Sequence, residues 1–309
     1  MNTVHTTLLV LGALYVILRW VFPRDRELSS AYLRYLLLGI AAFLILCPFV
    51  WLICAVLKDK DVLMQYTFLP PLTEWSSETL NFNNFLTLFA GEETVEGVVY
   101  FWEYVINSLF LASASTSISL LFASMGGYAL SKYEFQGKKA VMGFMVGSMM
   151  FPAMLFLAPV YKMIYNFGWM DTYLALLIPG ACSVFGMFLF RQAMTAVPDS
   201  LIEAARIDGA SEFGIYFGVV MPLVRPMTGA FCLITFLGNW NNFIGPQVFI
   251  QTQSKLPLPV VLNQYMGVYT QEYGVFLAGT LIAIIPPAVL FFALQKEFVS
   301  GLTSGAVKG

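Results

Sequence analysis

The sequence predicts an all-α polytopic membrane protein whose single membrane domain contains six spanning helices. Of its 309 residues, 59% are hydrophobic and 11% are charged, whereas about a quarter of the residues of a soluble domain are charged. Apolar runs that reach the ~20 residues needed to cross a bilayer recur six times. They are Leu33–Leu57, Tyr104–Leu130, Ala140–Ile164, Thr172–Ala196, Pro226–Gly245 and Val275–Leu294.

An additional apolar run, Thr7–Phe22, precedes these six. It is shorter and contains Arg19, which can snorkel to an interface, so the run either spans the membrane or lies along its surface. A cleaved signal peptide is disfavoured because Met1–Thr6 has no positive charge and no small-residue cleavage site precedes Arg24. We therefore expect an N-terminal extension over 1–30, a transmembrane domain over 31–300 and a tail over 301–309.

Lys and Arg residues predict the orientation. If the segment before Leu33 is cytoplasmic, the inner connections hold eleven of them and the outer connections hold four, Lys58, Lys60, Lys162 and Lys255. Positive charge accumulates on the cytoplasmic side. The polar segment 198–222 and the C-terminus are then cytoplasmic. Prolines inside several spans predict kinks, which are as typical of any polytopic protein as of a gate.

The polar segment 198–222 carries helix signals of its own. Ser200 and Glu203 form a capping-box pattern that predicts a helix from near Leu201 to Gly209. Ser211 is then a plausible N-cap for a second helix that stops at Pro222. Capping signals alone are equally typical of a generic amphipathic loop.

Residue types along the first helix favour a docking surface. Ala204 and Ala205 leave no bulk, so another protein can approach closely, while Glu203, Arg206 and Asp208 supply charges for that contact. We therefore interpret the segment as a docking site for a cytoplasmic partner.

The string Glu203-Ala204-Ala205, followed by Gly209 and by Met221-Pro222, resembles the EAA loop of the permease subunits of bacterial ABC importers. Other stretches resemble the carbohydrate-uptake group, and the C-terminal run from Phe298 resembles its MalG-like half. These stretches are Phe151-Pro152 with Pro159-Val160-Tyr161-Lys162, Trp240-Asn241-Asn242-Phe243, and Leu256-Pro257. The resemblance covers roughly Leu33 to Gly309. It departs at Thr7–Phe22, and at Asn242, where many relatives carry Glu.

The resemblance implies a six-helix type I ABC importer transmembrane domain with an additional N-terminal apolar helix, in the bacterial plasma (inner) membrane. It implies a permease for sugars or oligosaccharides that pairs with a MalF-like permease, a homodimer of ATP-binding subunits and an extracytoplasmic sugar-binding protein. The implied ATPase-coupling residues are Glu203, Ala204, Ala205, Asp208 and Gly209. Thr303, Gly305 and Lys308 of the tail are implied to contact the same ATPase.

Several chemistries are excluded or disfavoured by the sequence. The pair Gly137-Lys138 lacks the upstream glycine and the following Ser or Thr of a phosphate loop, so this chain is not the ATPase. ATP and Mg are then used by the partner ATPase, and this chain binds no cofactor. Its one histidine, His5, and four cysteines within apolar runs predict no catalytic, metal or disulfide site. We expect lipid contact and no nucleic-acid partner, since no basic cluster with interleaved aromatic residues occurs.

Candidates for the substrate path are polar residues in or near spans. Asn107, Asn239, Asn241 and Asn242 can pair with sugar hydroxyls, but asparagines also hydrogen-bond between helices. The acidic, aromatic outer loop Lys58–Glu103 either meets the binding protein or caps the bundle.

Three alternatives to a sugar permease remain at the level of sequence. An ABC permease for another polar solute is compatible with the EAA loop. An ion-driven secondary carrier should carry charges within its spans, and almost none occur here. A membrane enzyme lacks any clustered chemistry in a span.

Overall fold

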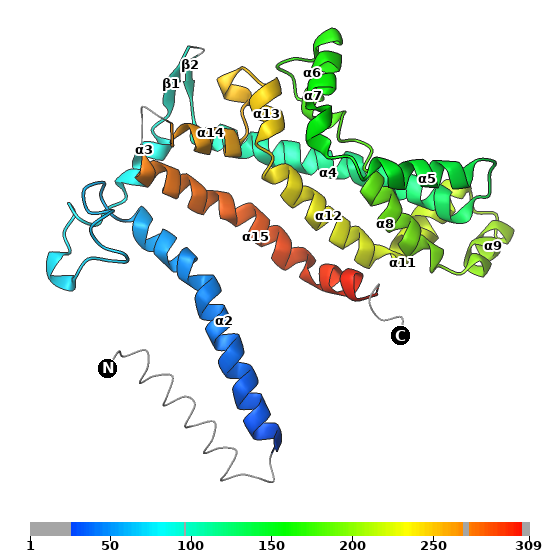
Figure 1. The fold of residues 1–309 in the computed structure, drawn as a ribbon, viewed down its shortest axis with the longest axis horizontal. Helices are drawn as coiled ribbons and strands as arrows, with labels where there is room; N and C mark the ends of the chain where they lie inside the picture. The colour runs from blue at the N-terminus through cyan, green and yellow to red at the C-terminus, as the bar shows by residue number, and fades with distance from the viewer. Residues whose placement is uncertain (1–25, 96, 268–271, 305–309) are drawn as a thin grey trace. The chain divides into compact units, whose positions relative to one another are not determined.

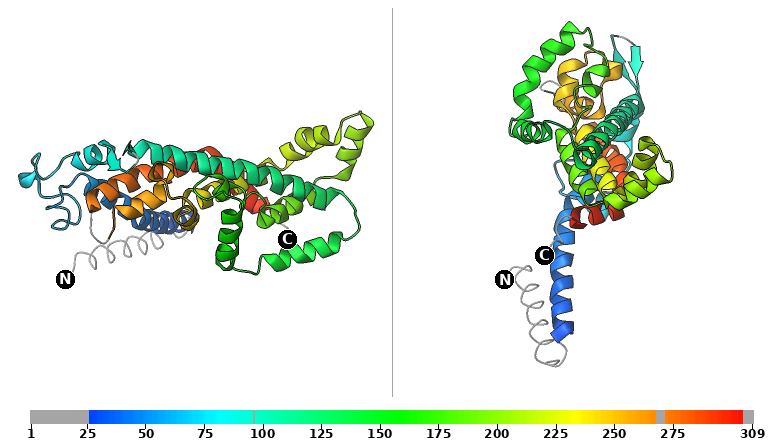
Figure 2. Two further views of the ribbon diagram at one scale, coloured as in Figure 1. Left: turned by 90° about the horizontal axis from the view of Figure 1, so that it is seen from above. Right: turned by 90° about the vertical axis from the view of Figure 1, so that its right-hand side faces the viewer.

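A computed structural model describes residues 26–95, 97–267 and 272–304. The run Thr7–Phe22 and the tail residues Gly305 and Lys308 lie outside these ranges. The described chain is mainly helical, as predicted, with one small β-hairpin (Figures 1 and 2). It divides into two compact units, one ending at Phe82 and the other beginning at Asn83.

The first unit contains α2 (Arg26–Val56) and the loop that follows it, with the short 3-10 helix η1 (Leu72–Glu74). The apolar part of α2, Arg34–Val56, confirms the first predicted span. Beyond α2 the loop closes around Lys58, whose Nζ donates to the carbonyls of Leu63 (3.2 Å) and Tyr66 (2.5 Å). A buried ammonium requires such acceptors.

The second unit begins with α3 (Asn83–Phe89) and an antiparallel hairpin of β1 (Glu92–Thr94) and β2 (Gly97–Val99), in which Glu93 pairs with Val98. The long helix α4 (Phe101–Lys132) follows and confirms the second predicted span. Its start is fixed by Glu103, whose carboxylate accepts the Tyr100 N–H at 3.0 Å.

The third predicted span is not one continuous helix. It consists of α5 (Lys138–Ser148), then the 3-10 helix η2 (Ala153–Phe156) and α6 (Leu157–Asn166), with the two halves bent by 96°. The break lies at Pro152, which has an extended backbone and no N–H to donate. Residues before a proline also avoid the helical region.

The fourth predicted span is also interrupted. It forms a single turn, α7 (Leu174–Leu177), and then α8 (Val184–Thr195), separated by the Pro179-Gly180 pair. Ser183 caps α8, since its side chain accepts the N–H of Gly186 at 3.0 Å.

The polar segment forms α9 (Asp199–Ile207), α10 (Glu212–Ile215), a π-helical turn η3 (Tyr216–Val220) and α11 (Met221–Leu223). The chain then bends by 82° into α12 (Arg225–Trp240), which carries most of the fifth predicted span. The second helix therefore extends one residue past Pro222, where it was predicted to stop.

The outer connection and last helix complete the unit. They comprise α13 (Ile244–Phe249), η4 (Gln253–Lys255), α14 (Leu258–Gln264) and α15 (Tyr273–Ser304). Pro286 and Pro287 lie inside α15 without ending it. The sixth predicted span is thus confirmed and extended in both directions.

Packing centres on α4, which contacts α8 and α12, while α12 packs along α15 (Figure 1). Gly127 permits a close approach of α4 and α8, because a Cβ there would lie 2.5 Å from the Cβ of Phe190 and 2.8 Å from the N of Arg191. Within the described ranges, three helices are long and apolar enough to cross a membrane, and two bent pairs raise the number to five. Two of the predicted spans are thus bent pairs, and the fourth, divided between α7 and α8, is not among these five.

Candidate functional site

The candidate site is α9, which begins at Asp199 after Pro198 rather than at Leu201. No side-chain hydrogen bond caps its start, so the predicted Ser200 capping box is wrong. Its end is a Schellman motif: the Ala210 N–H donates to the Ala205 carbonyl, and the Gly209 N–H donates to the Arg206 carbonyl, both at 3.0 Å. Gly209 has φ +83°, which confirms it as the point where the helix ends.

The start of α9 is held by the end of α4. The Lys132 Nζ donates to the Val197 carbonyl at 2.5 Å and to the Asp199 carboxylate at 2.6 Å. The Lys132 side chain is 6% exposed, so this ammonium has little access to water. The pair therefore joins a buried cation on α4 to the first turn of α9.

The end of α9 is held through α10. Arg206 donates from Nε to Glu212 at 2.7 Å and from Nη2 at 3.1 Å, a two-pronged ion pair. Tyr133, which follows α4 directly, donates its hydroxyl to the same Glu212 carboxylate. Both ends of α9 are thus tied to Lys132 and Tyr133, two adjacent residues at the end of α4.

These contacts set the protonation of the groups involved. The Arg206 guanidinium, followed by the Tyr133 hydroxyl, lowers the pKa of Glu212 to about 2. The hydrogen bond to Glu212, with burial as a second cause, raises the pKa of Tyr133 to about 12. At neutral pH Glu212 is therefore ionised and Tyr133 keeps its proton.

The inner face of α9 is anchored by one apolar side chain. Ile202 is 4% exposed and belongs to a buried cluster with Tyr128, Ile215 and Tyr216. The Tyr216 hydroxyl hydrogen-bonds Ser124 of α4 at 2.6 Å. Apolar packing and the two polar ties therefore fix α9 to the same end of α4.

The other face of α9 is open. Glu203, Ala204, Asp208 and Gly209 are all exposed. Ala205 is half-buried, and part of its surface packs against the buried cluster. Arg206, which was expected to offer its charge to a partner, is exposed and forms an ion pair with Glu212.

The four asparagines predicted to line the substrate path lie in three different environments. Asn107 donates to the carbonyls of Ser254 (2.8 Å) and Leu256 (3.1 Å), and so secures the outer connection. Asn239 and Asn242 line one small cavity between α4, α7 and α12. Asn241 is exposed and donates to the Leu237 carbonyl. Thr303 lies in the last turn of α15.

The part of the chain that contains α9 matches a known family. The profile described as "Binding-protein-dependent transport system inner membrane component" matches residues 119–303, more than half of the chain. The chain belongs to this family. Its members are transport permease subunits, a non-catalytic family, which confirms the expectation that the chain is not an enzyme. The ion-driven carrier is excluded by the same finding.

Two relatives support the assignment of this chain to the permease family. It is 34% identical to the arabinooligosaccharides transport system permease protein AraQ of Bacillus subtilis, over 75% of this chain and 80% of that protein. It is 30% identical to the trehalose/maltose transport system permease protein MalG of Thermococcus litoralis, over 89% and 96%. These matches confirm the predicted likeness to sugar ABC importer permeases.

A solved structure supports the fold of the permease. A chain of a bacterial ABC transporter involved in the import of the acidic polysaccharide alginate is similar with a TM-score of 0.74 and 24% identity. The match covers 89% of this chain and 98% of that chain. This confirms the predicted ABC importer transmembrane fold.

Sequence reasoning missed the residues that hold the permease's α9. Lys132 was counted among the eleven inner charges, and Tyr133 was assigned no role. The available signal was Glu212, which directly follows the predicted N-cap Ser211 and lies six residues after Arg206. Its partner on α4 lies 79 residues away in sequence, a distance that local patterns cannot bridge.

Proposed function

We propose that this permease forms one half of the translocation path of an ATP-driven importer for neutral sugars or oligosaccharides. The observation that carries the proposal is the exposed face of α9, held at both ends by α4. The sugar class is supported by the names of its relatives, which include arabinooligosaccharide and trehalose/maltose systems. A permease for another polar solute is the alternative.

In this proposal α9 docks in a cleft of a separate ATP-binding subunit through Glu203, Ala204, Asp208 and Gly209. Because Lys132, Tyr133 and Ile202 tie α9 to α4, movement of the docked helix passes to α4 as a rigid body. ATP and Mg are used by the ATPase, and this chain binds no cofactor. Thr303 and the tail residues Gly305 and Lys308 add a second contact with that subunit.

The proposal extends to two further partners. The permease pairs with a MalF-like second permease, and an extracytoplasmic sugar-binding protein delivers the substrate. With the excess of Lys and Arg inside, α9 and the C-terminus lie in the cytoplasm, while the hairpin of β1 and β2 lies on the outer side.

Coupling is tested by ATP hydrolysis in nanodiscs that contain the permease, its permease partner, the ATPase and the binding protein. Ala204→Phe adds bulk to the exposed face of α9, so stimulation by sugar-loaded binding protein should fall at least tenfold while the complex stays assembled. The control is Ala196→Phe, the same change at an exposed residue after α8. Equal stimulation in both variants would place the ATPase contact elsewhere.

The substrate class is tested in the same assay. Neutral di- and trisaccharides, supplied with the binding protein, should stimulate hydrolysis, whereas amino acids should not. Stimulation by an amino acid and by no saccharide would replace the sugar proposal with the other-solute alternative and leave the coupling result intact.

A further inference from the structure

A pocket of about 250 Å³ lies where the outer ends of several elements meet. Its wall combines α3, the hairpin, the start of α4, the end of α14 and the start of α15. The lining residues are Thr87, Leu88, Gly91, Glu92, Val99, Phe101, Tyr104, Gln264, Tyr265, Glu272 and Val275. Drug-sized ligands occupy pockets of about 300–1,000 Å³, so this one fits a smaller group such as a single side chain.

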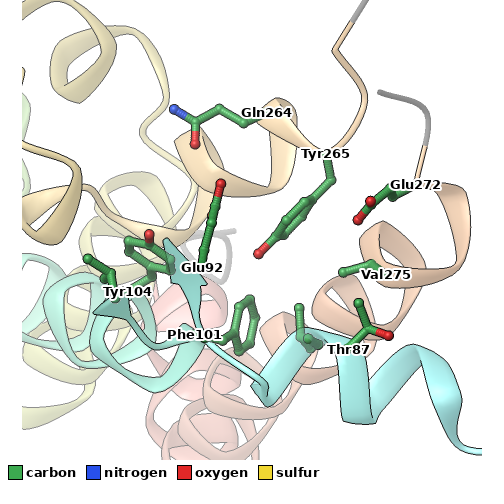
Figure 3. A pocket seen from close by; sticks show the side chains of 11 residues that line it. Thr87, Glu92, Phe101, Tyr104, Gln264, Tyr265, Glu272 and Val275 are labelled. Carbon is green, nitrogen blue, oxygen red and sulfur yellow. The ribbon is translucent and has the colours of Figure 1, made fainter. Parts of the chain in front are cut away.

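The pocket is negatively charged. Glu92 of β1 and Glu272 before α15 face the same hollow from different elements (Figure 3). None of its lining residues is Lys, Arg or His, and neither carboxylate forms an ion pair within the described part of the chain. Burial, and then the charge of Glu272, raise the pKa of Glu92. A positively charged guest would relieve both effects.

Aromatic rings complete the wall. Phe101 and Tyr104 are each 1% exposed, and Tyr265 points its hydroxyl toward the middle of the hollow (Figure 3). The Tyr104 oxygen accepts a hydrogen bond from Gln253 at 3.3 Å, which fixes its ring. Ring faces attract organic cations, and carboxylates add charge-assisted hydrogen bonds. The two together are the chemistry that recognises a guanidinium or an alkylammonium.

We propose that this outer pocket receives a positively charged side chain, arginine by preference, from the docked extracytoplasmic binding protein. Arginine is enriched at protein interfaces and anchors them in pockets. A planar guanidinium can stack on the half-buried Tyr265 while bonding to the carboxylates. The proposal rests on the proposed function for the identity of the partner and for the side of the membrane, whereas the charge preference rests on the pocket alone.

The charge preference is tested on the full chain in nanodiscs without any partner. N-acetylarginine amide should bind at least tenfold more tightly than N-acetylcitrulline amide, its neutral counterpart, in ligand-observed NMR. Glu92→Gln and Glu272→Gln should each reduce this ratio, because each removes a carboxylate from the pocket. Glu93→Gln is the matched control, since neighbouring residues of a strand point to opposite faces and Glu93 does not line the pocket.

The source of the cation is tested with the purified binding protein and the assembled transporter. Glu92→Gln should weaken binding of this protein about thirtyfold, which corresponds to the lower end of the cost of truncating a paired charge at an interface. Glu93→Gln should change it less than twofold. A photo-crosslinker in place of Tyr265 should capture a peptide of the binding protein that contains arginine or lysine.

Three results would overturn the proposal. Equal binding of the arginine and citrulline amides would show that the pocket does not discriminate a cation from a neutral ligand. Saccharide binding that needs Glu92, without arginine discrimination, would make it a sugar site. Arginine discrimination with unchanged binding-protein affinity would exclude this partner. If no binding protein stimulates the wild-type transporter, the proposed function fails, while the amide experiment still decides the charge preference.

Discussion

At the scale of single residues, Glu212 is the hub of the ties that hold α9. It is exposed, yet it joins Arg206 of α9 to Tyr133 beside α4. Exposed ion pairs contribute little to global stability. The value of this one therefore lies in fixing where α9 sits, a role that affects coupling more than folding.

Glu212→Gln removes the charge that holds Arg206 and Tyr133. We expect amide hydrogen exchange in α9 to become roughly two- to fivefold faster, in keeping with the size of exposed pairs. Binding-protein-stimulated ATP hydrolysis should fall, with basal hydrolysis unchanged. The control is Glu134→Gln, which removes one member of an exposed pair with Lys138 away from α9. Unchanged exchange in α9 of Glu212→Gln, with stimulated ATP hydrolysis intact, would contradict this role of Glu212.

The titration of Glu212 gives a second prediction. Its pKa is lowered from 4.5 to about 2, so its stabilising contribution is present above pH 4.5 and is lost as the pH falls through about 2. Tyr133→Phe should raise the midpoint, and Arg206→Gln should raise it further because the guanidinium is the larger cause. Carbon-13 NMR of the Glu212 carboxyl measures this, and a midpoint of 4.5 in the wild type would contradict the ion pair.

At the scale of elements, the turn after α9 depends on one glycine. Gly209→Ala places a side chain at φ +83°, which costs about 1–2 kcal/mol for an L-residue. We expect a lower melting temperature and looser α9. Gly218→Ala is the control, since Gly218 lies in η3 with open space around its Cβ position. Equal melting temperatures for the two variants would mean that the Schellman turn does not hold α9.

Close contact of α4 and α8 gives another element-scale prediction. Gly127→Ala would force a Cβ to within 2.5 Å of Phe190 and against the backbone of Arg191. Overpacking of this kind costs about 1–3 kcal/mol. The neighbouring Gly126→Ala meets only the flexible Met187 side chain, at 3.0 Å, and should be milder. Thermal unfolding in detergent compares the two, and a reversed order would contradict the helix contact.

Elements differed in how far the sequence could predict them. Apolar runs located α2, α4 and α15, because length and hydropathy suffice for an unbroken helix. The breaks at Pro152 and at Pro179-Gly180 were not predicted, since Pro48 and Pro286 lie in equally apolar runs and interrupt nothing. Whether a proline bends or breaks a helix depends on neighbouring helices that can satisfy the freed carbonyls.

The candidate site was predictable to a similar degree. Gly209 and Ser211 gave the turn between α9 and α10 because both act through local backbone geometry. The start at Asp199 was missed because Lys132, distant in sequence, bonds to Asp199 and to the carbonyl before Pro198. Local capping patterns cannot predict a contact with a residue that is distant in sequence, such as Lys132.

At the scale of the whole molecule, the orientation is open to direct measurement. After replacement of the four native cysteines by serine, a single cysteine at Glu203 should react with an impermeant maleimide only from the cytoplasmic side. A cysteine at Lys308 should behave in the same way, and one at Glu93 should react only from outside. Labelling of Glu203 and Glu93 positions from the same side would overturn the charge-based orientation.

Because both ends of α9 are bonded to residues at the end of α4, we expect the two helices to move together as one rigid body. A 32-residue helix is about 48 Å long, so a tilt of ~10° at one end displaces the other by roughly 8 Å. That far end carries Phe101 and Tyr104, which line the outer pocket. If both proposals hold, α4 connects the two proposed docking surfaces, one at each of its ends. By thermodynamic linkage, a guest that prefers one tilt of α4 changes the affinity of α9 for its own partner by the same factor.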